Sequence, residues 1–190
     1  MARTILYLIR HGEQAPTADD GTDGGLSELG RRQADRLGQR LVGVPFAEIH
    51  HSPLPRAVQT TDVIAGYLPD VPRHACEHAM DRTPMPSVER RIQYPERFLA
   101  WLDGVPAHER DENAVALQAA VERFARTDTH DRHELVITHN FVIGWFVRHV
   151  LDAPAWRWIG LNQENCGVTI VQFDADLPPT LVSFNDIGHL

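Results

Sequence analysis

Three apolar runs of this chain end in arginine or histidine. The first run is followed at once by Arg10 and His11. The second is followed one helical turn later by Arg56, and the third ends at His139. Arginine carries a planar, permanently charged fork that matches phosphate oxygens, and histidine can act as a nucleophile that forms a covalent intermediate. These residue types therefore predict a site that handles phosphate.

The runs themselves are typical of strands. The predicted strands are Ile5–Ile9, Phe46–His51 and Glu134–Thr138, and the first is apolar throughout, as expected for a strand buried on both faces. In open α/β sheets, ligands bind at the carboxyl ends of strands. Three strand ends that carry arginine or histidine therefore predict one shared site. Ser52 and His139 each stand just before a predicted helix, whose N-terminus would add N–H donors and a positive dipole.

Helices are predicted between and after these strands. Ser27 is the predicted N-cap of a helix that runs to about Val42 and buries Leu29 on its apolar side. The other predicted elements are helices over Pro53–Tyr67, Glu96–Leu102, Asp111–Thr127 and Asn140–Leu151, a short strand near Ala75, and a closing strand pair over Cys166–Phe173 and Thr180–Phe184. This alternation predicts an α/β fold, a three-layer α/β/α sandwich with a mainly parallel central sheet, with residues 1–190 as a single domain.

Composition narrows the classes of function. The chain has 190 residues, which is enough for one domain with its own core, and 43% of them are hydrophobic. The formal charge of -8 argues against a nucleic-acid partner that needs a broad basic surface. No apolar run approaches the roughly 18 residues of a membrane span, and the N-terminus has no secretory signature. Because Cys76 and Cys166 form no paired motif, we expect a cytoplasmic protein with free thiols and no membrane partner.

The chain resembles the histidine phosphatase superfamily, whose fold is phosphoglycerate mutase-like, and within it the small phosphatase branch. The resemblance spans essentially the whole chain and rests on four motifs in the family's order. They are Arg10-His11-Gly12-Glu13, Leu26-Ser27-x-x-Gly30-x-x-Gln33-Ala34, Ser52-Pro53-x-x-Arg56-Ala57-x-Gln59-Thr60 and Val136-Ile137-Thr138-His139-Asn140. The first motif alone is weak, but the four together are specific.

The resemblance implies roles for four of these residues. His11 would attack phosphorus and become a phosphohistidine, while Arg10, Arg56 and His139 would hold the phosphoryl oxygens and stabilise the transition state. The implied activity is that of a histidine acid phosphatase-like phosphomonoesterase, which needs no metal and no other cofactor.

The resemblance also implies a carboxylic acid that protonates the leaving oxygen. The family draws this general acid from the region after the second helix, where Asp81 is our first choice and Glu77 the second. Substrate-binding contacts are expected from Gly12, Gln14 and Asn140. The expected substrate is a phosphorylated small molecule or a phosphopeptide, and a homodimer is possible within this branch.

Two departures from the family pattern bear on the reaction. Mutases of this family carry serine or threonine and then asparagine after the first motif, where this chain has Gln14-Ala15-Pro16. The middle segment is also short for a mutase, which must shield the phosphoryl group from water. We therefore expect a phosphatase, with a mutase or a non-catalytic phosphate-binding module as alternatives. The acidic loop with Asp19, Asp20 and Asp23 is predicted to be solvated.

Overall fold

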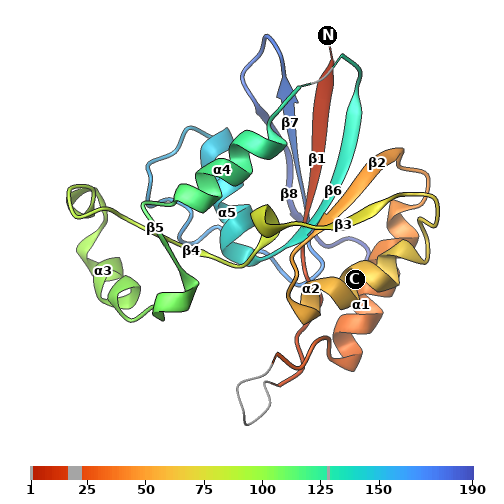
Figure 1. Cartoon of the computed structure of the whole chain (residues 1–190), viewed down its shortest axis with the longest axis horizontal. Helices are drawn as coiled ribbons and strands as arrows, with labels where there is room; N and C mark the ends of the chain where they lie inside the picture. The colour runs from red at the N-terminus through yellow and green to blue at the C-terminus, as the bar shows by residue number, and fades with distance from the viewer. Residues whose placement is uncertain (1, 17–22, 128) are drawn as a thin grey trace.

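The computed structural model describes residues 2–16, 23–127 and 129–190. Within these residues six strands form the central sheet, in the order β3-β2-β6-β1-β7-β8 (Figure 1). Their bounds are β1 Arg3–Arg10, β2 Phe46–His51, β3 Arg73–Ala75, β6 Arg132–Thr138, β7 Val168–Asp174 and β8 Thr180–Asp186. The first four in spatial order are parallel, whereas β7 runs antiparallel to β1 and β8 antiparallel to β7. The expected α/β fold with a mainly parallel sheet is confirmed.

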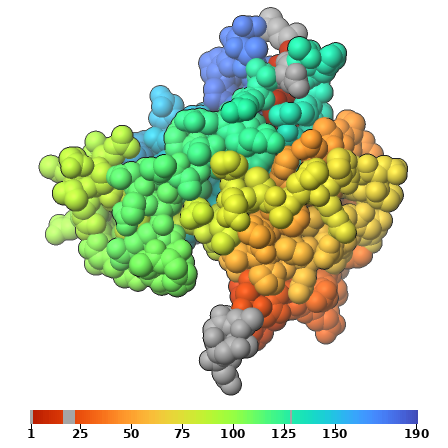
Figure 2. Space-filling model, in the orientation of Figure 1, coloured from red at the N-terminus to blue at the C-terminus, as the bar shows by residue number. Residues whose placement is uncertain are grey.

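Helices cover both faces of this sheet (Figure 1). Helices α1 and α2 pack on one face, and α4 and α5 pack on the other. The bounds are α1 Glu28–Leu41, α2 Pro55–Ala65, α3 Glu96–Asp103, α4 Val115–Phe124 and α5 Asn140–Val150, with short 3-10 helices at Glu77–Ala79, Arg91–Gln93 and Ala107–Glu109. The segment that carries α3 forms a lobe beside the sandwich, at the left of Figure 2.

Strand β1 shows why the sheet needs both layers. Successive side chains of a strand point to opposite faces. Leu6 and Leu8 are fully buried in the core under α4 and α5, whereas Ile9 is fully buried in the core under α1 and α2. An apolar run without alternation therefore signals a strand that is covered on both sides.

The register of the parallel strands brings the chemically important strand ends together. Arg10 of β1 lies opposite Thr138 of β6, and His51 of β2 lies opposite Ile137. The pairing continues one residue further, because the His11 N–H donates to the Thr138 carbonyl at 3.0 Å. All three strands thus end at one edge of the sheet, where α2 and α5 begin.

The start of α4 differs from the prediction. The expected helix over Asp111–Thr127 begins only at Val115, because Arg110–Glu112 forms strand β5, which pairs with β4 (Thr83–Met85). The carboxylate of Asp111 accepts hydrogen bonds from the N–H groups of Ala116 and Leu117 at 3.0 and 2.8 Å. Asp111 therefore caps the start of α4 from a strand outside the helix. In the sequence, an acidic residue in this position looks like part of the first turn of the helix.

The prediction for helix α1 is correct at its N-cap but needs one correction in its burial. Ser27 is the N-cap of α1, as predicted, and its hydroxyl accepts from the Gly30 N–H at 2.9 Å. Leu29 was expected to be buried, but it is 42% exposed.

In the residues that the structure describes, no helix has the length and apolar character to cross a lipid bilayer.

Gly30 allows the close approach of α1 to the segment after β1. A Cβ atom at this position would lie 2.1 Å from the Glu13 carbonyl oxygen, which is backbone and cannot turn away. We expect Gly30→Ala to lower the free energy of unfolding by about 1–3 kcal/mol, the usual cost of overpacking. Gly104→Ala is the matched control, because its Cβ would meet nothing closer than 3.4 Å. Equal stability of the two variants in urea unfolding would contradict the expectation.

Candidate active site

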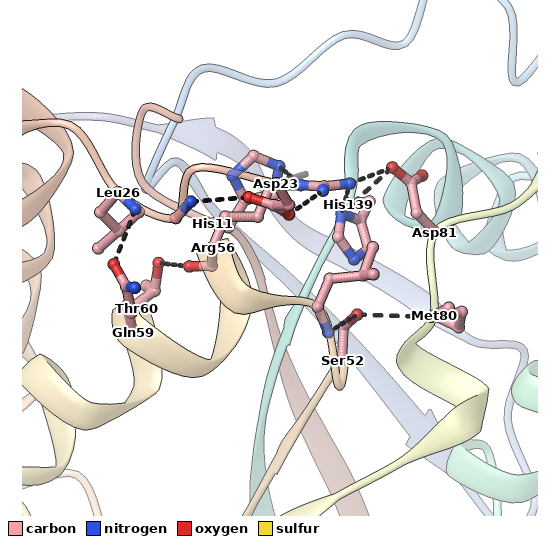
Figure 3. A network of polar contacts seen from close by, with 12 residues as sticks. His11, Asp23, Leu26, Ser52, Arg56, Gln59, Thr60, Met80, Asp81 and His139 are labelled. Carbon is pink, nitrogen blue, oxygen red and sulfur yellow. Dashed lines mark hydrogen bonds and ion pairs between the residues drawn. The ribbon is translucent and has the colours of Figure 1, made fainter. Parts of the chain in front are cut away.

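The strand ends open into a cavity of about 320 Å³. Its lining consists of Arg10, His11, Gln14, Arg56, Asp81, His139, Asn140, Phe141 and Asn165. All five residues that we predicted to be catalytic therefore lie around one cavity. Figure 3 shows His11, Arg56, His139 and Asp81 pointing toward one another from separate elements.

His11 is held in one tautomer by its two neighbours. Its Nδ1 lies 2.8 Å from the Gly12 carbonyl oxygen, which can only accept, so Nδ1 carries the proton. On the other side of the ring, the Arg56 Nε–H donates to Nε2 at 3.1 Å. Because Arg56 can only donate, Nε2 keeps its lone pair. Nε2 of this cavity-lining residue is thus unprotonated, with its lone pair accepting from Arg56.

The surroundings keep His11 neutral. Burial lowers the pKa of His11 to about 4, and the positive charges of Arg56 and Arg10 act in the same direction. The Gly12 carbonyl and Asp23 oppose this shift only in part. At neutral pH the imidazole is therefore uncharged, which is the form that a nucleophile requires.

Arg56 is the centre of the polar network (Figure 3). In addition to its contact with His11, its Nη1 lies 2.6 Å from Asp23 and its Nη2 lies 2.7 Å from Asp81. The Nη2 atom is also 3.3 Å from Nδ1 of His139. The guanidinium therefore contacts both histidines and both carboxylates.

Gly12 serves packing at the base of this network. Its N–H donates to the Thr60 hydroxyl at 3.0 Å, which in turn donates to the Arg56 carbonyl at 2.7 Å. A Cβ atom on Gly12 would lie 2.6 Å from the Gly30 carbonyl oxygen. Gly12 is not in the described lining of the cavity, and its N–H is engaged by Thr60, so in this structure it packs beneath the network and its substrate contact stays a prediction.

Arg10 is fixed by the loop that precedes β7. Its Nη1 donates to the Gln163 carbonyl at 2.5 Å, and its own carbonyl accepts from the Cys166 N–H at 2.9 Å. Asn140 holds this loop in turn, because its side-chain oxygen accepts from the Gln163 N–H at 2.8 Å. Asn165 donates to the His11 carbonyl at 2.9 Å and lines the cavity. Sequence reasoning missed Asn165, since no motif marks it.

His139 is the most deeply buried of the four basic groups, at 1% exposure. It stands at the N-cap of α5, and its ring centroid lies 5.1 Å from that of His11. Burial lowers the pKa of His139 well below its usual range, and the charges of His11, when it is protonated, and of Arg56 and Arg10 add to the effect. A neutral His139 can donate one N–H to a bound phosphoryl oxygen.

The geometry favours Asp81 over Glu77 as the acid. Asp81 lines the cavity, and its carboxylate lies 3.4 Å from Nδ1 of His139. Its pKa is raised by the desolvating surroundings, against the opposing charge of Arg56. Glu77 is exposed and is not in the described lining. The segment before Asp81 is anchored to the sheet, because the Thr138 hydroxyl donates to the Ala79 carbonyl at 2.7 Å.

The acidic loop needs a correction at Asp23. Asp19 and Asp20 lie outside the described residues. Asp23 is not solvated as expected: its side chain is only 14% exposed and is paired with Arg56, which is 12% exposed. Gln14 lines the cavity, and its backbone forms an isolated antiparallel bridge with Leu26.

Comparisons with known proteins decide the family. The family model for the histidine phosphatase superfamily (branch 1) matches residues 6–187. The chain belongs to the histidine phosphatase superfamily. It is 30% identical to the mitochondrial serine/threonine-protein phosphatase PGAM5 of Mus musculus, over 97% of this chain and 63% of that protein. The chain thus spans less than two thirds of the length of this relative.

Solved structures agree on the fold. A phosphoserine phosphatase mutant from Entamoeba histolytica, solved with phosphoserine, is 25% identical with a TM-score of 0.65, over 98% of this chain and 99% of that one. A phosphoglycerate mutase from Bacillus anthracis is 16% identical with a TM-score of 0.75, over 99% of this chain and 95% of that one. The second likeness concerns the fold alone.

The expected cellular location needs correction. We expected a cytoplasmic protein from the composition and the N-terminus. The curated relatives from nematode, frog and mammal are named as mitochondrial proteins, which contradicts this expectation. Composition and local hydropathy do not encode the compartment, because they report how a chain folds and not where it is delivered.

The state of His11 can be measured directly. We expect the ring nitrogens of His11, followed by ¹⁵N NMR, to titrate with a midpoint of about 4 and to show the Nδ1–H tautomer above it. The reason is that protonation would place a charge in a buried site beside two arginines. His11→Gln assigns the signals. A midpoint near the unperturbed value of about 6.5 would contradict the described environment.

Proposed function

We propose that this chain is a phosphatase that hydrolyses phosphomonoesters through a phosphohistidine on His11. Arg10, Arg56 and His139 bind the phosphoryl group, and Asp81 is the general acid. The observation that carries the proposal is the unprotonated Nε2 of His11, which faces a cavity lined by two arginines and a buried neutral histidine. A neutral nucleophile in a cationic pocket suits attack on an anionic phosphoryl group.

In the first step, the phosphoryl oxygens of the substrate take the Arg56 Nε–H that Nε2 of His11 accepts in the unliganded site. The lone pair of Nε2 is then free to attack phosphorus in line with the leaving oxygen. The N–P bond forms while the P–O bond to the substrate breaks, and Asp81 gives its proton to the departing oxygen. The raised pKa of Asp81 supports this role, because a proton must be present on the acid when the substrate binds. The Gly12 carbonyl, already paired with Nδ1, stabilises the positive charge that the ring gains.

In the second step, water replaces the leaving group. The Asp81 carboxylate takes a proton from this water, whose oxygen attacks phosphorus as the P–N bond breaks. Inorganic phosphate leaves, and both His11 and Asp81 return to their starting states. Arg10 and Arg56 offset the charge on the phosphoryl oxygens throughout, so the proposed cycle uses no metal ion.

The proposed substrate is a phosphoserine or phosphothreonine ester within a peptide. A second cavity of about 410 Å³ shares Arg56 and Asp81 with the first and is also lined by Leu54, Met80 and Glu109. This second cavity offers room for the parts of a peptide substrate that lie beyond the leaving oxygen. The mouse relative is a serine/threonine-protein phosphatase, which supports a phosphoserine or phosphothreonine peptide, and the Entamoeba histolytica neighbour is a phosphoserine phosphatase, which supports a phosphoserine ester.

The nucleophile is tested with a generic aryl phosphate in the presence of EDTA. We expect phosphate release by the wild type and a loss of at least about a thousandfold in kcat/KM for His11→Ala, because the proposed intermediate forms on His11. His74→Ala is the control, since His74 lies on the exposed edge strand β3. Full activity of His11→Ala, or inhibition by EDTA, would refute the mechanism. Transfer to a second hydroxyl without net phosphate release would point to a mutase.

The general acid is tested by comparing leaving groups. An alkoxide leaves poorly without a proton, whereas an aryl oxide needs little help. We therefore expect Asp81→Asn to lower kcat by about 10²–10⁴-fold on a phosphoserine peptide and by far less on an aryl phosphate. Glu77→Gln serves as the matched control and should leave both rates unchanged. Equal losses of Asp81→Asn on both substrates would exclude the acid role.

A further inference from the structure

The contacts of Arg56 divide its guanidinium into two parts with different tasks. Nε and Nη2 share one edge, which is the edge that binds two oxygens of a phosphate side by side. This edge faces the catalytic cavity, because Nε contacts His11 at 3.1 Å and Nη2 contacts Asp81 at 2.7 Å. The third nitrogen, Nη1, lies apart from this edge and contacts Asp23 at 2.6 Å.

The carboxylate of Asp23 is itself held in place. Its Oδ1 accepts from the Gly25 N–H at 2.8 Å, which leaves Oδ2 for Nη1 of Arg56. Both partners are largely buried, with side chains 14% and 12% exposed. A charge-assisted hydrogen bond in such surroundings is stronger than an ion pair on the open surface.

The segment that carries Asp23 is tied to the same helix as Arg56 (Figure 3). The Leu26 N–H donates to the side-chain oxygen of Gln59 at 2.8 Å, and Gln59 lies one turn after Arg56 on α2. The Gly25 carbonyl accepts from the Ala15 N–H at 2.9 Å. Asp23 is therefore attached to α2 on one side and to the segment after β1 on the other.

We propose that Asp23 is a positioning residue for the reaction, which acts through Arg56. By fixing Nη1, it keeps the Nε–Nη2 edge turned toward the place beside Nε2 of His11 where the phosphoryl group binds. This inference rests on the proposed phosphatase function. It assigns Asp23 no contact with the substrate phosphoryl group, in line with its place in the lining of the second cavity and not of the first.

A carboxylate at Asp23 could instead compete with phosphate for Arg56, and the two roles predict opposite changes in phosphate affinity when Asp23 is removed. If its carboxylate competed with phosphate for Arg56, its removal would strengthen phosphate binding. If it positions Arg56, its removal frees the guanidinium to rotate and weakens both phosphate binding and turnover. The direction of the change therefore decides between the two roles.

The first experiment measures kcat, KM and the inhibition constant of inorganic phosphate with an aryl phosphate substrate. We expect Asp23→Ala to raise KM and the phosphate inhibition constant about tenfold, the loss expected for one charge-assisted hydrogen bond. Asp23→Asn should lie between Asp23→Ala and the wild type, because an amide oxygen can still accept from Nη1. The control is Asp62→Asn on the same helix α2. This variant removes an exposed ion pair between Asp62 and Arg73 of β3, and it should change neither constant.

A double-mutant cycle shows whether Asp23 acts through Arg56. Lysine has no Nη1, so Asp23→Asn should have little further effect in the Arg56→Lys background. Fully additive losses, an unchanged Asp23→Ala variant, or tighter phosphate binding by Asp23→Ala would each overturn the inference. Thermal unfolding of each variant identifies a loss that comes from misfolding.

Phosphate binding by calorimetry separates this inference from the proposed function. If the wild type binds phosphate but releases none from any ester, the proposed hydrolysis fails. Weaker phosphate binding by Asp23→Ala would then still support the role of Asp23 in holding Arg56. If the wild type is active and Asp23→Ala binds phosphate as the wild type does, the positioning role fails and the proposed hydrolysis stands.

Discussion

The parallel pairing of β1, β2 and β6 is the constraint on which the rest of this structure depends. It places Arg10 opposite Thr138 and extends to a hydrogen bond from His11, so that three strands end at one edge. Residues more than a hundred positions apart in the chain thereby line one cavity. Helices α2 and α5 start at this edge, where Arg56 lies in the first turn of α2 and His139 is the N-cap of α5. The site is therefore a consequence of strand register more than of any local motif.

Burial among positive charges gives this cavity its chemical character. Two histidines would ordinarily be partly protonated near neutral pH, but here the pKa values of His11 and His139 are both lowered. Desolvation is the main cause, and the neighbouring arginines reinforce it. The same desolvation raises the pKa of Asp81, whose proton is the one that the proposed mechanism needs. One physical effect thus prepares both the proposed nucleophile and the proposed acid.

The supporting contacts show how much of the chain serves to hold two arginines. Arg10 is fixed by the Gln163 carbonyl, and that loop is fixed by Asn140. Arg56 is fixed by Asp23 on the side away from the cavity. Long, flexible side chains lose entropy when they are ordered, and these contacts supply that ordering before a ligand arrives. This ordering would pre-organise the site for the anionic substrate of the proposed reaction.

Several features followed from the sequence alone. The bounds of β2, the N-cap role of Ser27 and the strand ends that carry Arg10 and His139 are written in short-range patterns of apolar, capping and charged residues. Such patterns reflect local backbone preference and burial, which a sequence expresses directly. The family also followed, because its motifs lie at those strand ends and helix starts.

Tertiary structure alone decided the rest. In the sequence Asp23 resembles a solvated loop residue and Asn165 carries no signal, but in the structure Asp23 contacts Arg56 and Asn165 donates to the His11 carbonyl. Asp111 resembled the first turn of a helix but lies in a strand that pairs with Thr83–Met85. The physical reason is common to all three. Their roles depend on partners distant in the chain, and the free energy of such contacts exists only once the sheet has brought those partners together.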